Sequence, residues 1–373
     1  MKVTDIEMIP VAMDMPEPLY WGLFSIRKRG ACLLRIRTDE GITGIGECGF
    51  SVEGAPMIEP VVRGLLAPLV VGRDPFEVEA IWEAMYTHTH KWGRRGIETY
   101  AMSGIDIALW DIIGKATGQP LYRLFGGYQR TVPAYSAPAL KEASVVERET
   151  AEALAQGFRA IKLRFGLGPE KDREILCAAR KMAGPEVALM VDPNMAYDFR
   201  GALELTRFLA DHGVLWLEEP IRTRGLPEYL RAHARLRAES PIAISGAECL
   251  LTRYEVAEAV AVGGFDIYQP DATGVGGISE MRKIGGMLAG HDLRLVPHIA
   301  CASICGVGLA ANLHVICASP NAPYVEYDAY DSPIRRELFR EPILAQDGTV
   351  TVPDRPGLGL EVDEGALARY RVT

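Results

Sequence analysis

The stretch Ala160-Ile-Lys-Leu-Arg164 is a short apolar run that carries two cations, and it is one of a series. Similar runs recur every 25 to 30 residues or so, roughly the length of one βα unit, with longer amphipathic stretches between them. The runs are residues 132–135, 160–164, 187–192, 214–218, 242–245, 265–269, 293–297 and 324–326. Eight parallel strands can close a barrel. The sequence therefore predicts an α/β fold with a (β/α) barrel over residues 131–330.

Residues 1–130 show a different, mixed α and β pattern. Residues 31–37 read as a strand, residues 41–49 read as a turn plus a second strand, and residues 56–69 and 77–87 read as helices. This predicts an α+β domain, and the Pro-rich tail 331–373 is expected to return to it. A doubly wound open sheet is the alternative, but it would normally show a Gly-rich first turn, which the sequence lacks.

Composition narrows the function classes. The chain has 373 residues, is 48% hydrophobic and carries a formal net charge of −9, which disfavours nucleic acid and anionic membranes as partners. The first ten residues lack a long apolar run, so we expect neither a signal peptide nor a membrane span, and a cytoplasmic location. The seven cysteines show no CxxC spacing, which indicates reduced thiols.

Charged side chains stand at or near the ends of the predicted strands, where a barrel interior would otherwise be apolar. In parallel strands these ends gather at one mouth of the barrel, where barrel enzymes place their active sites. The residues are Lys162, Arg164, Asp192, Glu218, Glu248, Asp271, His298 and Glu326.

Three acids from adjacent strands predict a metal site. Asp192, Glu218 and Glu248 can converge on one point, and unpaired they would repel one another. Ligation by oxygen alone favours Mg²⁺ over Zn²⁺. The alternative reading of each residue is a surface acid at a strand end.

The remaining polar residues suggest acid–base chemistry. Lys162 and Arg164 point the same way on one strand, either toward anions in the barrel or as an exposed basic edge. An Asp beside a His raises the basicity of the imidazole, so Asp271 and His298 predict a general base. Glu326 could remain protonated and donate a hydrogen bond to an enolate oxygen.

The ordered set of motifs resembles the enolase superfamily, in particular its mandelate racemase subgroup. The matching pieces are Lys162-Leu-Arg164, Asp192-Pro-Asn194, Trp216-Leu-Glu218-Glu219-Pro220, Gly246-Ala-Glu248, Gln269-Pro-Asp271, Pro297-His298, Val325-Glu326-Tyr327 and the N-terminal stretch from Asp39-Glu-Gly41 to Gly44-Ile-Gly46-Glu47. The resemblance implies an α+β capping domain over a modified TIM barrel, and a homo-oligomer.

The resemblance also implies roles for individual residues. Asp192, Glu218 and Glu248 look like magnesium ligands, with Glu219 as an alternative to Glu218. Asp271 and His298 resemble the catalytic dyad, and Glu326 resembles the acid that binds the substrate carboxylate. Candidate substrate and lid residues are Tyr20, Trp21, Phe24, Phe50 and Asn194. Exposed aromatic residues can also belong to interfaces.

One position departs from the family pattern. Racemases of this subgroup carry Lys-x-Lys, whereas the second position here is Arg164, a poor base. We therefore hypothesise proton abstraction beside a carboxylate through a metal-stabilised enolate, followed by dehydration of a sugar acid, an aldonate or aldarate, to a 2-keto-3-deoxy acid. The alternatives are a racemase or epimerase of a 2-hydroxy acid, a Schiff-base aldolase that uses Lys162, and a catalytically retired acid-binding barrel.

Overall fold

The computed structural model describes residues 1–21, 24–93, 95–299, 306–328, 330 and 332–372, except that the side chains of Trp21 and Phe24 lie outside the description. The chain begins with a three-stranded antiparallel sheet in the order β1 (Val3–Trp21), β2 (Phe24–Thr38) and β3 (Thr43–Glu47). β2 is apolar at successive positions because both of its faces are covered. Ala31 and Leu33 belong to the core shared with the barrel, whereas Cys32 and Leu34 face the N-terminal helices.

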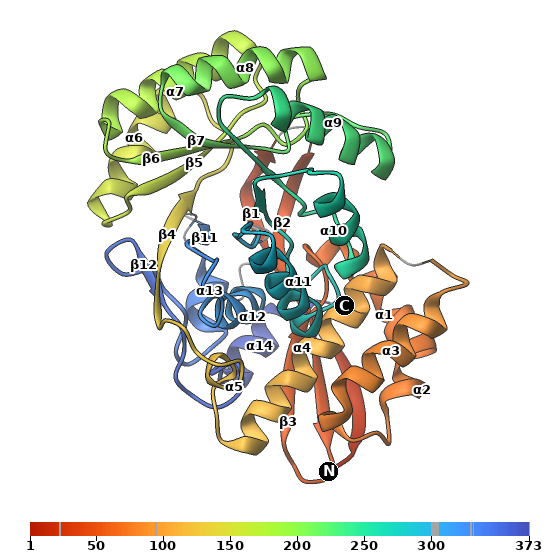
Figure 1. Cartoon of the computed structure of the whole chain (residues 1–373). Helices are drawn as coiled ribbons and strands as arrows, with labels where there is room; N and C mark the ends of the chain where they lie inside the picture. The colour runs from red at the N-terminus through yellow and green to blue at the C-terminus, as the bar shows by residue number, and fades with distance from the viewer. Residues whose placement is uncertain (22–23, 94, 300–305, 329, 331, 373) are drawn as a thin grey trace.

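Helices pack against the outer face of this sheet (Figure 1). They are α1 (Ala55–Val61), α2 (Ala67–Val70), α3 (Val78–Thr89) and α4 (Ile97–Thr117). The short α5 (Leu121–Leu124) follows α4, and its Leu121 and Tyr122 belong to the core shared with the barrel. α4 approaches β3 closely because both carry glycine at the contact: a Cβ on Gly46 would lie 1.9 Å from the carbonyl oxygen of Gly104. No single helix in the described ranges is long and apolar enough to cross a membrane, although the bent pair Val52–Val70 and Pro75–Thr89 passes that test by length and composition.

Eight parallel strands follow, and all eight predicted runs are confirmed as strands. They are β4 (Thr131–Ala137), β5 (Ala160–Arg164), β6 (Ala188–Asp192), β7 (Val214–Glu218), β8 (Ala243–Gly246), β9 (Ile267–Tyr268), β10 (Arg294–Leu295) and β11 (Val325–Asp328). Their order is β10-β9-β8-β7-β6-β5-β4-β11. Within the described residues no ladder joins β10 to β11; instead the Leu295 N–H donates to Asn321 O at 3.1 Å. The fold is the predicted modified barrel with a cap.

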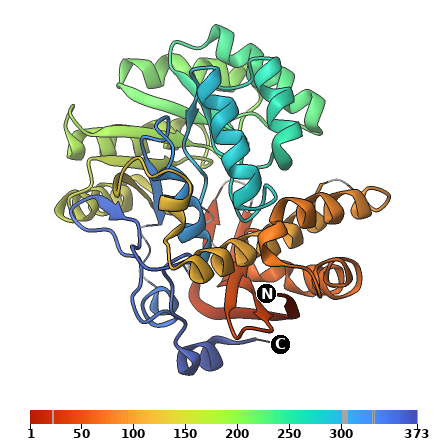
Figure 2. The same cartoon turned by 60° about the horizontal axis from the view of Figure 1, so that its bottom comes forward.

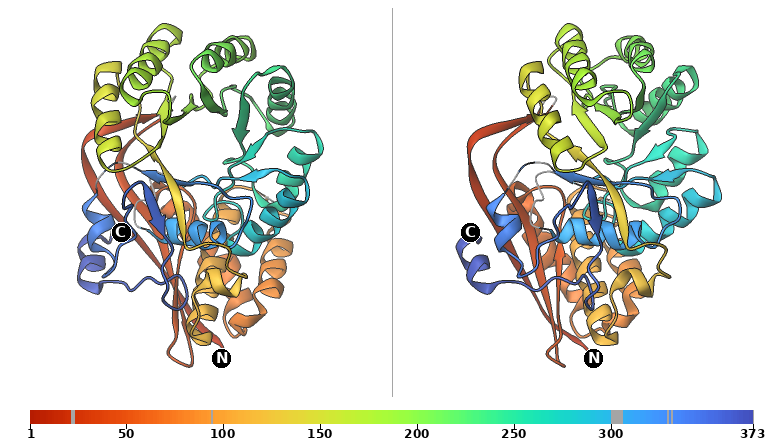
Figure 3. Two further views of the ribbon diagram at one scale, coloured as in Figure 1. Left: turned by 60° about the vertical axis from the view of Figure 1, so that its left-hand side comes forward. Right: turned by 90° about the vertical axis from the view of Figure 1, so that its left-hand side faces the viewer.

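Helices surround the strands on the outside (Figure 3). They are α6 (Ala143–Ala155), α7 (Pro169–Ala183), α8 (Phe199–Asp211), α9 (Leu226–Glu239), α10 (Thr252–Ala261), α11 (Ile278–Gly290) and α12 (Val307–Ile316). Because each helix returns the chain to the same end of the sheet, the carboxyl ends of the strands all lie at one mouth.

The tail contains α13 (Pro333–Glu337), β12 (Thr349–Thr351) and α14 (Glu364–Tyr370), and it runs from the barrel back to the N-terminal sheet (Figure 2). β12 pairs with β4. Farther on, Val11 forms a bridge with Arg371, and the Val372 N–H donates to Pro10 O at 2.9 Å. The tail thus contacts both parts, and the boundary near residue 130 stays a proposal.

Candidate active site

The mouth of the barrel brings the predicted polar residues together. Lys162 and Arg164 stand on β5, Asp192 ends β6, and Glu218 ends β7. The remaining residues are Glu248, Asp271 and His298, in the loops after β8, β9 and β10, and Glu326 on β11. Because each residue lies at or near the carboxyl end of a parallel strand, all these side chains gather at the mouth of the barrel.

Lys162 is the central cation of this cluster. It is fully buried, and its Nζ lies 2.7 Å from Glu326 Oε1, 3.1 Å from both oxygens of Glu218 and 3.6 Å from Asp192 Oδ2. Burial by itself lowers the pKa of Lys162, but Glu218 and Glu326 raise it more, so the net pKa lies above its ordinary value. Lys162 is therefore a fixed ammonium rather than a free amine.

Arg164 lies one step farther along the same face of β5. It pairs with Asp192, and its Nη2 lies 3.8 Å from Glu326 Oε1. Burial raises the pKa of Asp192, whereas Arg164 opposes this rise. The guanidinium is thus a buried positive charge between two acids, and arginine remains protonated in proteins.

His298 and Asp271 form a hydrogen-bonded pair. His298 Nδ1 lies 3.2 Å from Asp271 Oδ2, so Nδ1 carries the donated proton and Nε2 faces the mouth, 3.4 Å from Glu248 Oε2. Burial lowers the pKa of His298, but Glu248 and then the bond to Asp271 raise it, to about 10. Loss of negative charge at Glu248 would therefore lower this pKa and free the Nε2 lone pair.

The pKa of Glu326 is shifted in the direction opposite to the one that a protonated acid requires. Burial raises its pKa, but Lys162, His298 and Arg164 lower it more, to about 2. This lowered pKa favours the ionised carboxylate, which accepts the Ile299 N–H at 3.0 Å, whereas the sequence suggests a protonated acid that donates to an enolate oxygen. The sequence offers Lys162 and Arg164 as cations that could face anions in the barrel, but it does not show that both face Glu326.

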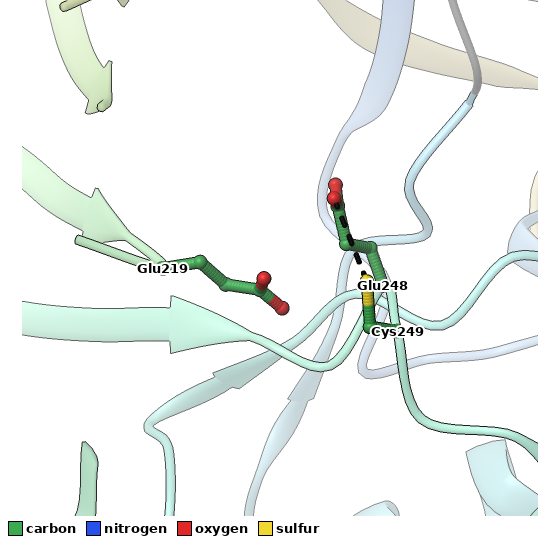
Figure 4. Close-up of side chains that lie close together, drawn as sticks. All are labelled: Glu219, Glu248 and Cys249. Carbon is green, nitrogen blue, oxygen red and sulfur yellow. Dashed lines mark hydrogen bonds between the residues drawn. The ribbon is translucent and has the colours of Figure 1, made fainter. Parts of the chain in front are cut away.

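The three predicted metal ligands come from adjacent strands, but they are not gathered equally closely. In the described part of the chain, the set of acidic or thiol ligand atoms that lie within 4.8 Å of one another is Glu219, Glu248 and Cys249 (Figure 4). Asp192 and Glu218 instead share Lys162. The donor chemistry of Asp192, Glu218 and Glu248 still fits Mg²⁺, because all the donors are oxygens. The buried Asn194 Oδ1, without a hydrogen-bond partner within the described ranges, adds another.

Non-glycine residues in left-handed backbone follow three neighbouring strands. Asn194 has φ 47°, Glu219 has φ 31° and Ala247 has φ 91°. Hydrogen bonds hold these turns: the Asn194 N–H donates to Asp192 Oδ1 at 2.8 Å, and the Ala247 N–H donates to Glu219 Oε1 at 2.9 Å. Such strain is common at functional sites because it aims particular side chains. Here the strained residues lie within two positions of the predicted metal ligands Asp192, Glu218 and Glu248.

The lid residues predicted from the sequence fall into two groups. The Phe50 ring stands edge-on to His298 with centroids 5.6 Å apart, and it also contacts Tyr100 at 5.2 Å. Tyr20 is 55% exposed near the end of β1, where its carbonyl accepts the Leu140 N–H beyond β4. The side chains of Trp21 and Phe24 lie outside the described residues. Phe50 is thus the predicted lid residue that the structure brings to the dyad.

Several residues at the site were not predicted individually. The Gln269 Nε2 donates to Glu218 Oε2 at 2.9 Å, and Thr273 and Asn312 both donate to Asp271 Oδ1. Gln269 belongs to a quoted motif, so its position offered a signal. Asn312 stands on α12, far along the chain, and nothing in its sequence surroundings marks it.

Comparisons with known proteins agree with this architecture. Residues 4–126 match the family described as "Mandelate racemase / muconate lactonizing enzyme, N-terminal domain", and residues 145–366 match "Enolase C-terminal domain-like". D-galactarolactone cycloisomerase of Agrobacterium fabrum is 36% identical over 386 residues, covering 100% of this chain and 99% of the relative. Arabinonate dehydratase of Saccharolobus solfataricus is 37% identical over 341 residues, covering 90% and 89%.

A solved structure gives the same fold together with a metal. The structure described as a racemase from Streptomyces coelicolor A3(2) with bound magnesium has a TM-score of 0.88 and 30% identity, and it covers 99% of this chain and 100% of that chain. Magnesium is thus a cofactor of this family, as the sequence predicts. The matched regions span cap and barrel alike, and the chain belongs to the mandelate racemase and muconate lactonizing enzyme group of the enolase superfamily.

Proposed function

We propose that this enzyme removes the proton beside the carboxylate of a sugar acid and then expels the β-hydroxyl, giving a 2-keto-3-deoxy acid. The observation that carries the proposal is the pairing of Arg164 with Asp192 and its approach to Glu326. A guanidinium held between two acids cannot serve as a second base. A dehydratase needs only one base, because the same imidazole can return its proton to the departing hydroxyl.

The residues take the following roles in this proposal. Asp192, Glu218 and Glu248 would hold magnesium, which supplies a Lewis acid for the substrate carboxylate. Lys162 and Arg164 supply further positive charge where negative charge develops on that carboxylate. His298 Nε2 takes the α-proton while Asp271 accepts from Nδ1 and holds the ring.

The elimination balances with these groups alone. The Cα–H bond breaks and its proton moves to His298, the Cβ–O bond then breaks, and the imidazolium protonates the leaving oxygen to form water. The resulting enol becomes the 2-keto acid by taking a proton at Cβ and releasing the proton of its hydroxyl group to solvent. Neutral imidazole is the active form at the start, and because Glu248 raises the pKa of His298, a cation held by Glu248 would favour that form.

A cycloisomerase is the second candidate, favoured by the full-length similarity to D-galactarolactone cycloisomerase. If the leaving oxygen belonged to a ring, the same proton abstraction would open the ring without loss of water. Racemisation or epimerisation is the third candidate, and it requires proton delivery to the opposite face of the substrate.

Product mass and isotope content separate these outcomes. The magnesium-loaded enzyme would be incubated in D₂O with a library of aldonates, aldarates and their lactones. Apart from deuterium taken up at Cβ, dehydration predicts a product lighter by one water. A ring-opened product that has lost no water would identify cycloisomerisation, and inversion at the α-carbon with deuterium incorporation there would reverse the proposal in favour of a racemase.

One variant tests the assigned base. His298→Asn should abolish turnover while Mg²⁺ binding, measured by calorimetry, persists. Full activity in EDTA together with borohydride trapping at Lys162 would favour the aldolase alternative, and intact binding without turnover of any library member would favour a retired barrel. A homo-oligomeric state and a cytoplasmic location remain parts of this proposal, testable by sedimentation and fractionation.

A further inference from the structure

The loop after β8 brings a thiol to the edge of the proposed magnesium site. Cys249 directly follows Glu248, and its Sγ lies 4.0 Å from Glu248 Oε1. Glu219 reaches toward the same place from the end of β7 (Figure 4). One ligand atom from each residue lies within 4.8 Å of the other two.

The Glu219 carboxylate is fixed by hydrogen bonds in a position from which it could bind a cation. Its Oε1 accepts hydrogen bonds from the Tyr229 hydroxyl at 2.5 Å and from the Ala247 N–H at 2.9 Å. Its Oε2 is buried without a hydrogen-bond partner within the described ranges, in a side chain that is 2% exposed and directed toward Cys249 (Figure 4). A buried, unpartnered carboxylate oxygen is unfavourable. A bound cation would satisfy it.

The donor set differs in kind from that of the magnesium site. One sulfur and two carboxylate oxygens suit a thiophilic divalent cation, whereas Mg²⁺ prefers oxygen ligands alone. Donor atoms around tetrahedral zinc lie roughly 3 to 4 Å apart, so side-chain movements of about 1 Å would close the set.

We propose that Glu219, Glu248 and Cys249 form a binding site for Zn²⁺ or Cd²⁺ that shares Glu248 with the magnesium site, so that the two sites cannot be filled together. Binding forms a sulfur–metal bond, breaks the S–H bond and releases the proton to solvent, with no electron transfer. The mutual exclusion rests on the proposed function, because it needs Glu248 as a magnesium ligand. The thiolate site itself does not.

Ultraviolet charge-transfer absorption of Cd²⁺–thiolate bonds tests the site directly in the full chain. The parent protein is Cys177→Ser, because Cys177 is an exposed thiol 3.9 Å from His212 Nε2 and could bind Cd²⁺ separately. Titration of the metal-free parent should give a band that saturates at one Cd²⁺ per chain. The band should vanish in the parent that also carries Cys249→Ser, with circular dichroism confirming that this variant is folded. A band that survives Cys249→Ser overturns the site.

Glu219→Gln separates the carboxylate from the thiol. This variant keeps Cys249, so the band should reappear at higher Cd²⁺, with an affinity lower by about tenfold or more. An unchanged affinity would remove Glu219 from the site and contradict the proposal.

Competition with magnesium tests the sharing of Glu248. At Mg²⁺ about tenfold above its own Kd, the apparent Kd for Cd²⁺ should rise about tenfold. A band that depends on Cys249 and Glu219 but does not yield to Mg²⁺ supports the thiolate site and contradicts instead the magnesium role proposed for Glu248. The two failures are therefore distinguishable.

Discussion

Asn312 holds Asp271 from the side opposite His298: Asn312 Nδ2 donates to Asp271 Oδ1 at 3.0 Å, while Asp271 Oδ2 faces His298 Nδ1 at 3.2 Å. Asn312 Oδ1 also accepts the Ala272 N–H at 3.0 Å. The side-chain amide of Asn312 on α12 thus fixes both the Asp271 carboxylate and the backbone of the next residue, Ala272. The orientation of the imidazole therefore depends on a fully buried residue that acts through Asp271.

Asn312→Ala should lower kcat by roughly 10- to 100-fold with little change in KM, because a hydrogen bond to a charged group contributes about 1.5–3 kcal/mol. The pH profile of kcat should shift as well, since Asp271 would be held less firmly against the imidazole. The control is Asn321→Ala, which removes a part-buried amide that donates to Gly285 O and Leu293 O. Equal losses of kcat in both variants would reduce Asn312 to a structural role.

The position of the Phe50 ring should affect substrate affinity, and Gly274 leaves room for that ring. A Cβ added at Gly274 would lie 2.7 Å from Phe50 Cζ, so Gly274→Ala should displace the ring that borders His298 and raise KM about tenfold, in line with overpacking costs of about 1–3 kcal/mol. Steady-state kinetics check this. Adding Phe50→Leu makes room for the new methyl group and should recover part of the loss. If the double variant is worse than either single variant, the steric explanation fails.

Arg164 should matter for stability as well as for activity. Arg164→Met leaves Asp192 buried without its guanidinium partner, and loss of one member of a buried pair costs about 3–5 kcal/mol. Urea unfolding would measure the free energy of unfolding of the variant and of the wild type. Arg200→Met is the matched control, because Arg200 is 89% exposed and pairs with Glu204 along α8, so its change should stay within about 0.5 kcal/mol. Similar losses in the two variants would count against a buried ion pair.

The sequence predicted the barrel well because burial and period act together there. Each strand is a short apolar run. Packing of the barrel does not explain the charged residue at or near its end, so that residue indicates a functional site. β1 was not predicted as a 19-residue strand, because Asp14 and Pro16 interrupt its apolar pattern and the pairing shifts register between Asp14 and Leu19. α4 is buried around most of its circumference, so it shows no amphipathic period.

The site could be predicted in its residue types but not in its pairings. Which acid Lys162 or Arg164 contacts depends on side-chain positions across several strands, and so does the ionised state of Glu326. The left-handed turn at Ala247 carries no glycine to mark it, since Glu219 stabilises it from another strand. These are tertiary effects that no local pattern encodes.

We expect two buried histidines, His314 and His233, to lower the free energy of unfolding at acid pH. His314 Nδ1 accepts the Tyr122 N–H at 3.0 Å, so the neutral ring has its proton on Nε2, and a proton on Nδ1 would oppose that donor. His233 Nδ1 lies 2.8 Å from Tyr229 O. Burial lowers the pKa of each to about 4, below the ordinary 6.5.

The unfolded chain binds more protons than the native state between pH 6.5 and pH 4, so each histidine should reduce stability as the pH falls through this window and add no further loss below it. A shift from 6.5 to about 4 corresponds to about 3 kcal/mol per histidine. His314→Gln keeps an acceptor for the Tyr122 N–H but cannot titrate. Urea unfolding of this variant at pH 7 and at pH 4 should therefore show a smaller difference than the wild type by about that amount. Parallel pH curves for variant and wild type would mean that His314 is protonated in the folded protein.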